Sequence, residues 1–416
     1  MSEVPKIIEL AGVVDPFLNG GKLISYTSRY LTKTGENYGS IMLAITAKVQ
    51  RLSGDVEELA LVAKLPPITN DFFWNIFQPE RTCRTEIAVY KYVAPALRQL
   101  QWEMGLDEEE IFDGFSIYYG SRVSLDPDST RVDRNALLVQ ENLQASGFKP
   151  GNREKMFDLS HAKFILKEMA KYHALPIALR VKRPQVFEED VRPYFRHFNI
   201  DSGLGEKEKK QVETDLLEQV AIATNNADRY VEGVRELYRD LQKYRDSVDE
   251  VKDNLYTTIV HYDLWINNIM LKYDDNGLPC KVKFVDFQIS QYGSLAHDVV
   301  FFLFSSVESA VLDQHFDELI SLYYQSFLNC LNSLKTPTES YSYVGFLKEV
   351  HKQAPIEIAT ALFMVKIILA DHSTLPDDYK DLDLSVMSKN VGKENIIKRT
   401  SDIIRLAEKY NFFLSY

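Results

Sequence analysis

The first third of the chain alternates apolar and polar residues in short runs, a pattern typical of β-strands. Three such runs are separated by turn-forming residues: 25–32, 41–49 and 59–64. A fourth short apolar run, residues 136–140, is also predicted to be a strand. Together they predict a small antiparallel sheet in the N-terminal part of the chain.

Apolar residues take up helical spacing between residues 81 and 100, where Pro95 is expected to end or kink the helix. Helical patterns then dominate the rest of the chain, at residues 158–174, 206–250, 296–332, 354–371 and 394–410. The sequence therefore predicts an α+β protein. We expect a small N-terminal lobe at residues 1–140, a larger and mainly helical lobe at 141–416, and a hinge near residues 139–146.

Composition narrows the classes of function. The chain has 416 residues, of which 45% are hydrophobic, and a net charge of −12. That charge disfavours nucleic acids and acidic membranes as partners. Three cysteines without a CxxC pair indicate neither a disulfide framework nor a zinc site, so a reducing, cytoplasmic location is expected. The most apolar run, residues 356–370, is too short to span a bilayer and is predicted to be a buried helix.

The stretch His261-Tyr-Asp263-Leu-Trp-Ile-Asn-Asn268 has the spacing of a phosphotransferase catalytic loop. In such a loop one carboxylate orients the attacking hydroxyl and accepts its proton, and an amide five residues later faces a metal ion. Asp263 fits the first role and Asn268 the second. Asp286 follows a predicted strand at residues 282–285 and could complete a Mg²⁺ site. The alternative is that these residues only cap turns between strands.

The N-terminal part offers residues that could bind the phosphates of ATP. The turn after the first strand is a candidate flap, formed by Gly35, Glu36, Asn37 and Tyr38 and followed by Gly39. An ordinary hairpin explains this turn about as well. Lys64 ends a strand and could reach the phosphates, and Glu86 could hold the Lys64 ammonium in place. For either residue alone a surface charge is the better explanation, but the order of the flap, Lys64, Glu86, the catalytic loop and Asp286 along the chain favours the functional interpretation.

Other residues are expected to support the site. Main-chain groups near the predicted hinge would bind the adenine edge, at Gln140, Glu141 and Leu143. His261 is expected to hold the loop, and His297 to be structural. Asp298 could be a helix cap, a loop anchor or a ligand.

Several motifs together resemble one family. They are Gly-Glu-Asn-Tyr, Val-Ala-Lys-Leu-Pro-Pro, Glu-Asn-Leu-Gln-Ala-Ser-Gly-Phe-Lys, a helix beginning His-Ala-Lys-Phe-Ile-Leu, His-x-Asp-Leu-Trp-x-Asn-Asn-Ile-Met and Phe-Val-Asp-Phe-Gln. In this order, over about residues 35–330, they are similar to the ecdysteroid kinase-like family of insects, a branch of the choline kinase and aminoglycoside phosphotransferase group.

The resemblance implies a two-lobed protein-kinase-like fold and ATP-dependent phosphorylation of a hydroxyl on a small molecule, for some members an ecdysteroid alcohol. It also implies residue roles: Lys64 as the phosphate-anchoring lysine, Glu86 as its partner, Asp263 as catalytic base, and Asn268 and Asp286 as metal ligands. One position departs from the family pattern, because Tyr262 stands where the family has glycine. A tyrosine there could reshape the acceptor pocket or slow the reaction.

The leading hypothesis is an ATP- and Mg²⁺-dependent kinase for a hydrophobic alcohol such as a steroid or xenobiotic. Four aromatic residues could line its pocket, although core packing explains most of them as well: Phe187, Tyr194, Phe195 and Phe198. One alternative is a catalytically weakened kinase-fold protein that binds a hydrophobic ligand or partner. A protein kinase is less favoured, because Asp-Phe-Gln replaces Asp-Phe-Gly and no Ala-Pro-Glu follows.

Overall fold

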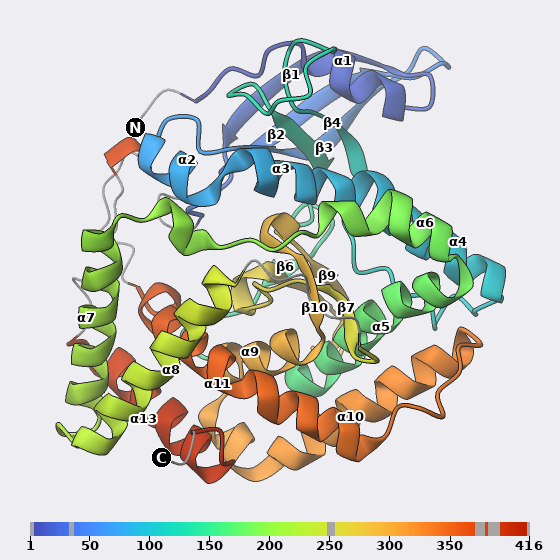
Figure 1. Cartoon of the computed structure of the whole chain (residues 1–416). Helices are drawn as coiled ribbons and strands as arrows, with labels where there is room; N and C mark the ends of the chain where they lie inside the picture. The colour runs from blue at the N-terminus through green and yellow to red at the C-terminus, as the bar shows by residue number, and fades with distance from the viewer. Residues whose placement is uncertain (1–3, 33–36, 248–253, 371–378, 382–391, 414–416) are drawn as a thin grey trace.

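The structure is a computed structural model that describes residues 4–32, 37–247, 254–370, 379–381 and 392–413. Its N-terminal part is built on a five-stranded antiparallel sheet, seen at the top of Figure 1, with strand order β1-β2-β3-β5-β4. The strands are β1 (Lys22–Tyr30), β2 (Ile41–Gln50), β3 (Val56–Leu65), β4 (Tyr118–Arg122) and β5 (Leu137–Glu141). The four predicted strands are therefore present, and β4 is an additional one.

The helix predicted over residues 81–100 lies beneath the sheet and is longer than expected (Figure 1). It consists of α3 (Pro79–Ala88), a π-helical turn at Val89–Val93, and α4 (Ala94–Met104). Pro95 neither ends nor breaks it. A π-type turn is wider than an α-helical one, which makes room for a residue that lacks an N–H and carries a ring. Two shorter helices also belong to this part: α1 (Leu10–Val14) and α2 (Asp71–Phe77).

The larger part is mainly helical, as predicted, and most of its helices lie in the lower half of Figure 1. Its helices are α5 (Leu159–Lys182), α6 (Pro184–Val186), α7 (Glu206–Ala223), α8 (Asp228–Asp246), α9 (Ala296–Ser306), α10 (Ser309–Ser333), α11 (Tyr343–Ile368) and α13 (Glu394–Lys409). Helix α5 begins after Asp158, whose carboxylate accepts the N–H of His161 (3.0 Å). The apolar run at 356–370 is the second half of α11, which starts earlier than expected because Ser342 caps it.

Two small sheets enclose the candidate catalytic loop. Strand β7 (Thr257–Val260) pairs with β10 (Gln291–Ser294), and β8 (Ile269–Tyr273) pairs with β6 (Lys149–Pro150) and β9 (Pro279–Phe284). Residues 261–268 therefore leave β7 and enter β8, and Asp286 follows β9. Helix α9, every residue of which is buried, packs beneath this loop.

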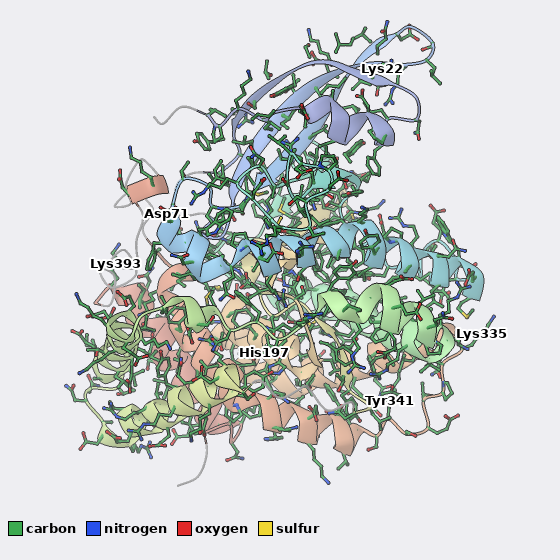
Figure 2. The ribbon with its side chains drawn as sticks, turned by 45° about the horizontal axis from the view of Figure 1, so that its top comes forward. Lys22, Asp71, His197, Lys335, Tyr341 and Lys393 are labelled. Atoms are coloured by element: carbon green, nitrogen blue, oxygen red, sulfur yellow. The ribbon has the colours of Figure 1, made fainter. Side chains whose placement is uncertain are left out.

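A chain segment between α6 and α7 crosses the molecule and connects its two parts. In Figure 2 it can be followed at the labelled His197, between the α3 and α8 regions. The carbonyl of Arg196 accepts a hydrogen bond from Arg81 of α3 (2.6 Å), and a ring nitrogen of His197 contacts the carbonyl of Arg245 in α8 (2.7 Å). Among the described residues, no helix combines the length and the apolar character needed to cross a bilayer.

Candidate functional site

The backbone of the loop after β7 is held by Asp298, at the start of α9. This buried carboxylate accepts the N–H groups of His261 and Tyr262, both at 2.8 Å, and faces His173 Nε2 at 3.0 Å. Burial alone would raise the pKa of Asp298, but the hydrogen bond and charge of His173 and the loop N–H groups hold this pKa below its ordinary value. Of the three roles considered for Asp298, the geometry supports that of loop anchor.

His261 connects the loop to the segment that carries Asp286. Its Nε2 donates to the carbonyl of Val285 (3.0 Å), and its Nδ1 accepts the N–H of Asp263 (3.3 Å). Burial lowers the pKa of His261, so the ring is neutral with its proton on Nε2. The expectation that His261 holds the loop matches these contacts, which fix Asp263 and Asp286 relative to one another.

Asp263 and Asn268 contact each other directly. The side-chain N–H₂ of Asn268 donates to Oδ2 of Asp263 (2.9 Å) and to its main-chain carbonyl (2.8 Å). Because both bonds use the nitrogen, Oδ1 of Asn268 is left for another partner, such as a metal ion. Burial, and secondly the nearby charge of Asp286, raise the pKa of Asp263 well above its ordinary range. A raised pKa suits a group that must accept a proton.

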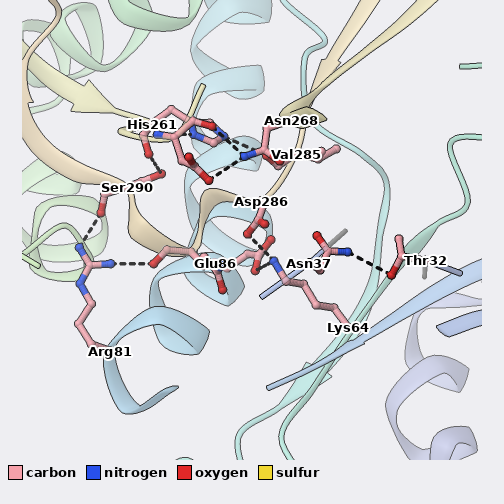
Figure 3. Close-up of polar contacts among 12 residues, drawn as sticks. Thr32, Asn37, Lys64, Arg81, Glu86, His261, Asn268, Val285, Asp286 and Ser290 are labelled. Atoms are coloured by element: carbon pink, nitrogen blue, oxygen red, sulfur yellow. Dashed lines mark hydrogen bonds and ion pairs between the residues drawn. The ribbon is translucent and has the colours of Figure 1, made fainter. Parts of the chain in front are cut away.

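Lys64 joins the two parts of the molecule at this site (Figure 3). Its ammonium contacts Glu86 of α3 at 2.5 Å and Asp286 at 2.6 Å. The side chain is only 8% exposed, and burial would lower its pKa, yet the two carboxylates shift the pKa of Lys64 upward overall. The structure thus brings together a lysine, a glutamate and an aspartate that were singled out from three separate stretches of sequence.

The candidate metal ligands are Asp286 and Asn268. The main-chain N–H of Val285 donates to the carbonyl of Asn268 (3.0 Å), which places the two ligand-bearing segments side by side. Among the described residues, no group of three or more His, Cys, Asp or Glu side chains could hold a metal ion. One carboxylate and one amide oxygen fit Mg²⁺, which takes few protein ligands and completes its shell with water and phosphate oxygens.

The candidate flap is described only in part, because Gly35 and Glu36 lie outside the described residues. Asn37 donates to Thr32 Oγ1 (3.3 Å), and the Tyr38 ring packs on Phe73 of α2 (5.8 Å between centroids). At the neighbouring Gly39, a Cβ atom would lie 2.6 Å from Gln288 Nε2 and 2.7 Å from the Phe77 ring. Glycine at position 39 therefore allows a close approach to Phe77 and Gln288 that a larger residue could make only if these side chains moved.

The three residues near the predicted hinge differ in the hydrogen-bonding groups that they could present to adenine. Gln140 lies buried within β5, and the Glu141 carboxylate accepts the N–H of Ile117 (3.0 Å). Leu143 is buried against Phe148, but its main-chain N–H donates to no other described residue. A main-chain contact from Leu143 is thus compatible with the geometry, and adenine binding by these three residues stays a prediction.

Arg81, which the sequence did not single out, fixes α3 to the segment after Asp286 (Figure 3). Its guanidinium donates to the carbonyls of Gln288 (3.0 Å) and Ser290 (2.6 Å) as well as to that of Arg196. Burial lowers the pKa of Arg81 to about 9. Because Glu86 lies on the same helix, this clamp also positions the partner of Lys64.

A cavity of about 230 Å³ opens beside these residues. Asp263, Asn268 and Asp286 form part of its wall, and Asn37 and Tyr38 also contact it. The remainder is mostly apolar and comes from α2, α7, α8 and α11, including Phe73, Ile76, Val212, Tyr238, Leu241, Ile356, Phe363, Met364 and Ile367. A large apolar pocket with a few polar groups on one side is a typical small-molecule site.

Of the four aromatic residues considered for the pocket, one lines the cavity and three do not. Phe198 lines the cavity, whereas Phe187 and Phe195 are buried in the main hydrophobic core and Tyr194 stacks on Tyr92 (5.6 Å). Most of the cavity wall, such as Tyr244 and Glu357, was missed. Helical spacing identified these helices, but the wall depends on how distant helices pack together.

The chain was also compared with known protein families, curated sequences and solved structures. The model of the ecdysteroid kinase-like family matches residues 34–336 of the chain. A crystal structure of a spectinomycin phosphotransferase with ADP and spectinomycin is 11% identical, with 93% of each chain covered and a TM-score of 0.41. A mutant aminoglycoside 2′-phosphotransferase IIIa in complex with GDP is 13% identical, covers 89% of this chain and 94% of its own, and has a TM-score of 0.33. No curated protein sequence matches the chain.

Proposed function

Because this chain belongs to the ecdysteroid kinase-like family, we propose that it transfers the terminal phosphate of ATP to a hydroxyl of a hydrophobic small molecule. The expected α+β, protein-kinase-like fold is confirmed by its antiparallel sheet, the helix beneath it and the helical bulk. One observation carries the proposal: Asp263 stands on the wall of an apolar cavity, next to Asn268 and Asp286.

In the proposed reaction the acceptor hydroxyl approaches Asp263, which orients it and takes its proton. The acceptor oxygen forms a bond to the terminal phosphorus while the bond from phosphorus to the bridging oxygen of ADP breaks. Lys64, held by Glu86, places a positive charge beside the phosphates. Mg²⁺ held by Asn268 and Asp286 would neutralise phosphate charge. The candidate flap, Gly35, Glu36, Asn37 and Tyr38, is proposed to cover the nucleotide.

The nature of the cavity supports a neutral, largely apolar acceptor. Its apolar wall can bury the apolar surface of an acceptor. The one arginine among the described lining residues, Arg245, is already paired with Asp201 at 2.6 Å. An anionic acceptor would find no spare positive charge among the described lining residues. A steroid or xenobiotic alcohol fits this description, and an ecdysteroid is the candidate that the family name provides. Three free thiols are compatible with a cytoplasmic setting, which is part of the proposal.

The test is release of ADP by the full-length protein from ATP, measured with and without Mg²⁺ across a panel of steroid and xenobiotic alcohols. We expect at least one alcohol to stimulate release in a Mg²⁺-dependent manner, with a phosphorylated product detected by mass spectrometry. If alcohols bind but none is phosphorylated, the alternative of a weakened, ligand-binding kinase fold is correct. Tyr262, which stands where the family has glycine and has a φ of 64°, is the feature that favours that alternative.

A further inference from the structure

We propose that the acceptor cavity contains a second polar anchor, the carboxylate of Glu357, which binds a hydroxyl or amino group of the acceptor other than the hydroxyl that is phosphorylated. The inference rests on the proposed function in so far as the cavity holds the acceptor. It identifies the acceptor further, as an apolar skeleton that carries at least two hydrogen-bond donors.

Glu357 is a charged residue in an apolar setting. It lies in the middle of α11, is only 5% exposed, and lines the same cavity as Asp263. Its Oε1 contacts His297 Nδ1 at 2.6 Å, and its Oε2 makes no hydrogen bond to any other described residue. A carboxylate oxygen on an otherwise apolar cavity wall is best stabilised by a hydrogen-bond donor. A ligand in the cavity can supply that donor.

The neighbours of Glu357 form a hydrogen-bonded chain along this part of the wall. His297 Nδ1 lies 2.6 Å from Glu357 Oε1, and His297 Nε2 lies 3.1 Å from the hydroxyl of Tyr244. The hydroxyls of Tyr244 and Tyr262 share a hydrogen bond at 2.6 Å. Glu357, Tyr244 and Tyr262 all line the cavity. The atom of this group without a hydrogen-bond partner among the described residues is Glu357 Oε2, an acceptor, so this part of the wall favours a hydroxyl or an amine over a ketone or a carboxylate.

The same chain connects the anchor to the catalytic loop. Tyr262 directly precedes Asp263, and its ring lies against His297 with centroids 4.7 Å apart. Its backbone is in the left-handed region, with φ of 64°, where a tyrosine is unfavourable. The contacts with Tyr244 and His297 hold the ring in this position. An acceptor bound at Glu357 would thus be positioned relative to Tyr262, the residue that directly precedes Asp263.

The experiment measures binding by calorimetry without nucleotide, so that it does not depend on phosphate transfer. The probes are matched steroid alcohols on one skeleton: a mono-ol, its diols and its amino alcohols. We expect at least one diol or amino alcohol to bind at least about 10-fold more tightly than the mono-ol. The Glu357→Gln variant should lose most of this preference, with mono-ol affinity changed less than about threefold.

Glu349→Gln is the matched control. Glu349 lies on the same helix and is also buried, but it contacts Gln353 and does not line the cavity. This variant should keep the preference. Tyr244→Phe provides a second test if Glu357→Gln folds poorly, because removing the hydroxyl breaks the chain and should weaken diol binding while the carboxylate remains.

Three results would overturn the anchor: equal binding of mono-ol, diols and amino alcohols; a preference that survives in both Glu357→Gln and Tyr244→Phe; or no binding by any diol or amino alcohol of the panel. The failure of the proposed function is read separately, from ADP release. If the protein phosphorylates alcohols but binds diols and amino alcohols no more tightly than the mono-ol, only the Glu357 anchor is wrong. If it binds diols or amino alcohols more tightly but never releases ADP, only the proposed kinase activity is wrong.

Discussion

At the scale of single residues, the loop after β7 keeps an unfavourable backbone conformation at the centre of the site. Tyr262 has a positive φ, which costs a non-glycine residue roughly 1–3 kcal/mol. Asp298 offsets part of this cost by accepting the N–H groups of both His261 and Tyr262. The loop is thus held by a buried carboxylate from another element, and removing the charge of that carboxylate should affect both stability and catalysis.

We therefore expect Asp298→Asn to destabilise the protein by about 3 kcal/mol, because one oxygen must replace two acceptors and the His173 contact loses its charge. The folded-state pKa of Asp298 is lowered, so its contribution to stability is present above the ordinary aspartate pKa and is lost as the pH falls through the folded-state value. Urea unfolding of the wild type and the variant at pH 7, and at several pH values below the ordinary aspartate pKa of about 3.9, measures this. A variant as stable as wild type at pH 7 would contradict the anchoring role.

At Lys366 we predict the opposite effect on stability: removing the charged group should stabilise the protein at pH 7. It is 1% exposed on α11, and burial lowers its pKa to about 8. Because this folded-state pKa lies below the unfolded one, the contribution of Lys366 to stability is full only above the unfolded pKa, and is lost as the pH falls through about 8. At pH 7 its charge is therefore a cost.

Lys366→Met should consequently stabilise the protein at pH 7 by about 1–3 kcal/mol, and by less at pH 10. Thermal unfolding at both pH values is the measurement. The exposed Lys352 of the same helix provides the control variant Lys352→Met, which should change stability little at either pH. An equal gain from both variants, or a gain larger at pH 10, would show that the charge of Lys366 is not the cause.

At the scale of elements, α3 is the piece that aligns the two halves of the site. Glu86 positions Lys64 from this helix, and Arg81 fixes the helix to the carbonyls of Gln288 and Ser290. Arg81→Lys keeps the charge but cannot reproduce a planar fork that reaches several acceptors. We expect a loss of about 2 kcal/mol in stability and a lower kcat/KM.

Arg84→Lys is the control on the same helix, since Arg84 makes only an exposed pair with Glu80. Urea unfolding and acceptor-dependent ADP release should both be near wild type for this control. If Arg81→Lys behaved in the same way, the clamp would not contribute to the alignment of α3.

The elements also show what the sequence could and could not predict. The spacing from Asp263 to Asn268 is local, so the loop was recognisable, and strong alternation identified β2 and β3. Strand β4 was missed because it is short and interrupted by Gly120, and its pairing to β5 is irregular there. The segment predicted as one helical zone, residues 296–332, is two helices, and the break near Val307 was missed because it carries neither glycine nor proline. Contacts between distant segments, such as Arg81 with Ser290, leave no local pattern.

At the scale of the whole molecule, the cavity is where the sheet-bearing part, the crossing segment and the helices α7, α8 and α11 meet. No single element contains it, which explains why its lining was largely unpredicted. The assignments of Lys64, Glu86, Asp263, Asn268 and Asp286 came from motifs, and the structure brings these side chains together. Their roles, and the position of the hinge near residues 139–146, stay predictions.

Filling the cavity should separate acceptor binding from nucleotide binding. Thr360 lies on α11 and lines the cavity, half-buried, and its hydroxyl contacts only the helix carbonyl of Ile356. Thr360→Phe should raise the KM for the acceptor about 10-fold or more by occupying apolar space, with the affinity for Mg·ATP unchanged. Unchanged acceptor kinetics together with weaker nucleotide binding would place the nucleotide, and not the acceptor, in this cavity.

The central claim is that Asp263 is the group that orients the acceptor hydroxyl and accepts its proton. The most direct measurement compares Asp263→Asn with wild type in acceptor-dependent ADP release and in Mg·ATP binding, with the exposed Asp275→Asn as control. We predict that kcat falls by roughly 10²- to 10⁴-fold in Asp263→Asn, while its nucleotide affinity stays within about twofold and the control is unaffected. An Asp263→Asn variant that phosphorylates the acceptor at the wild-type rate would contradict the account.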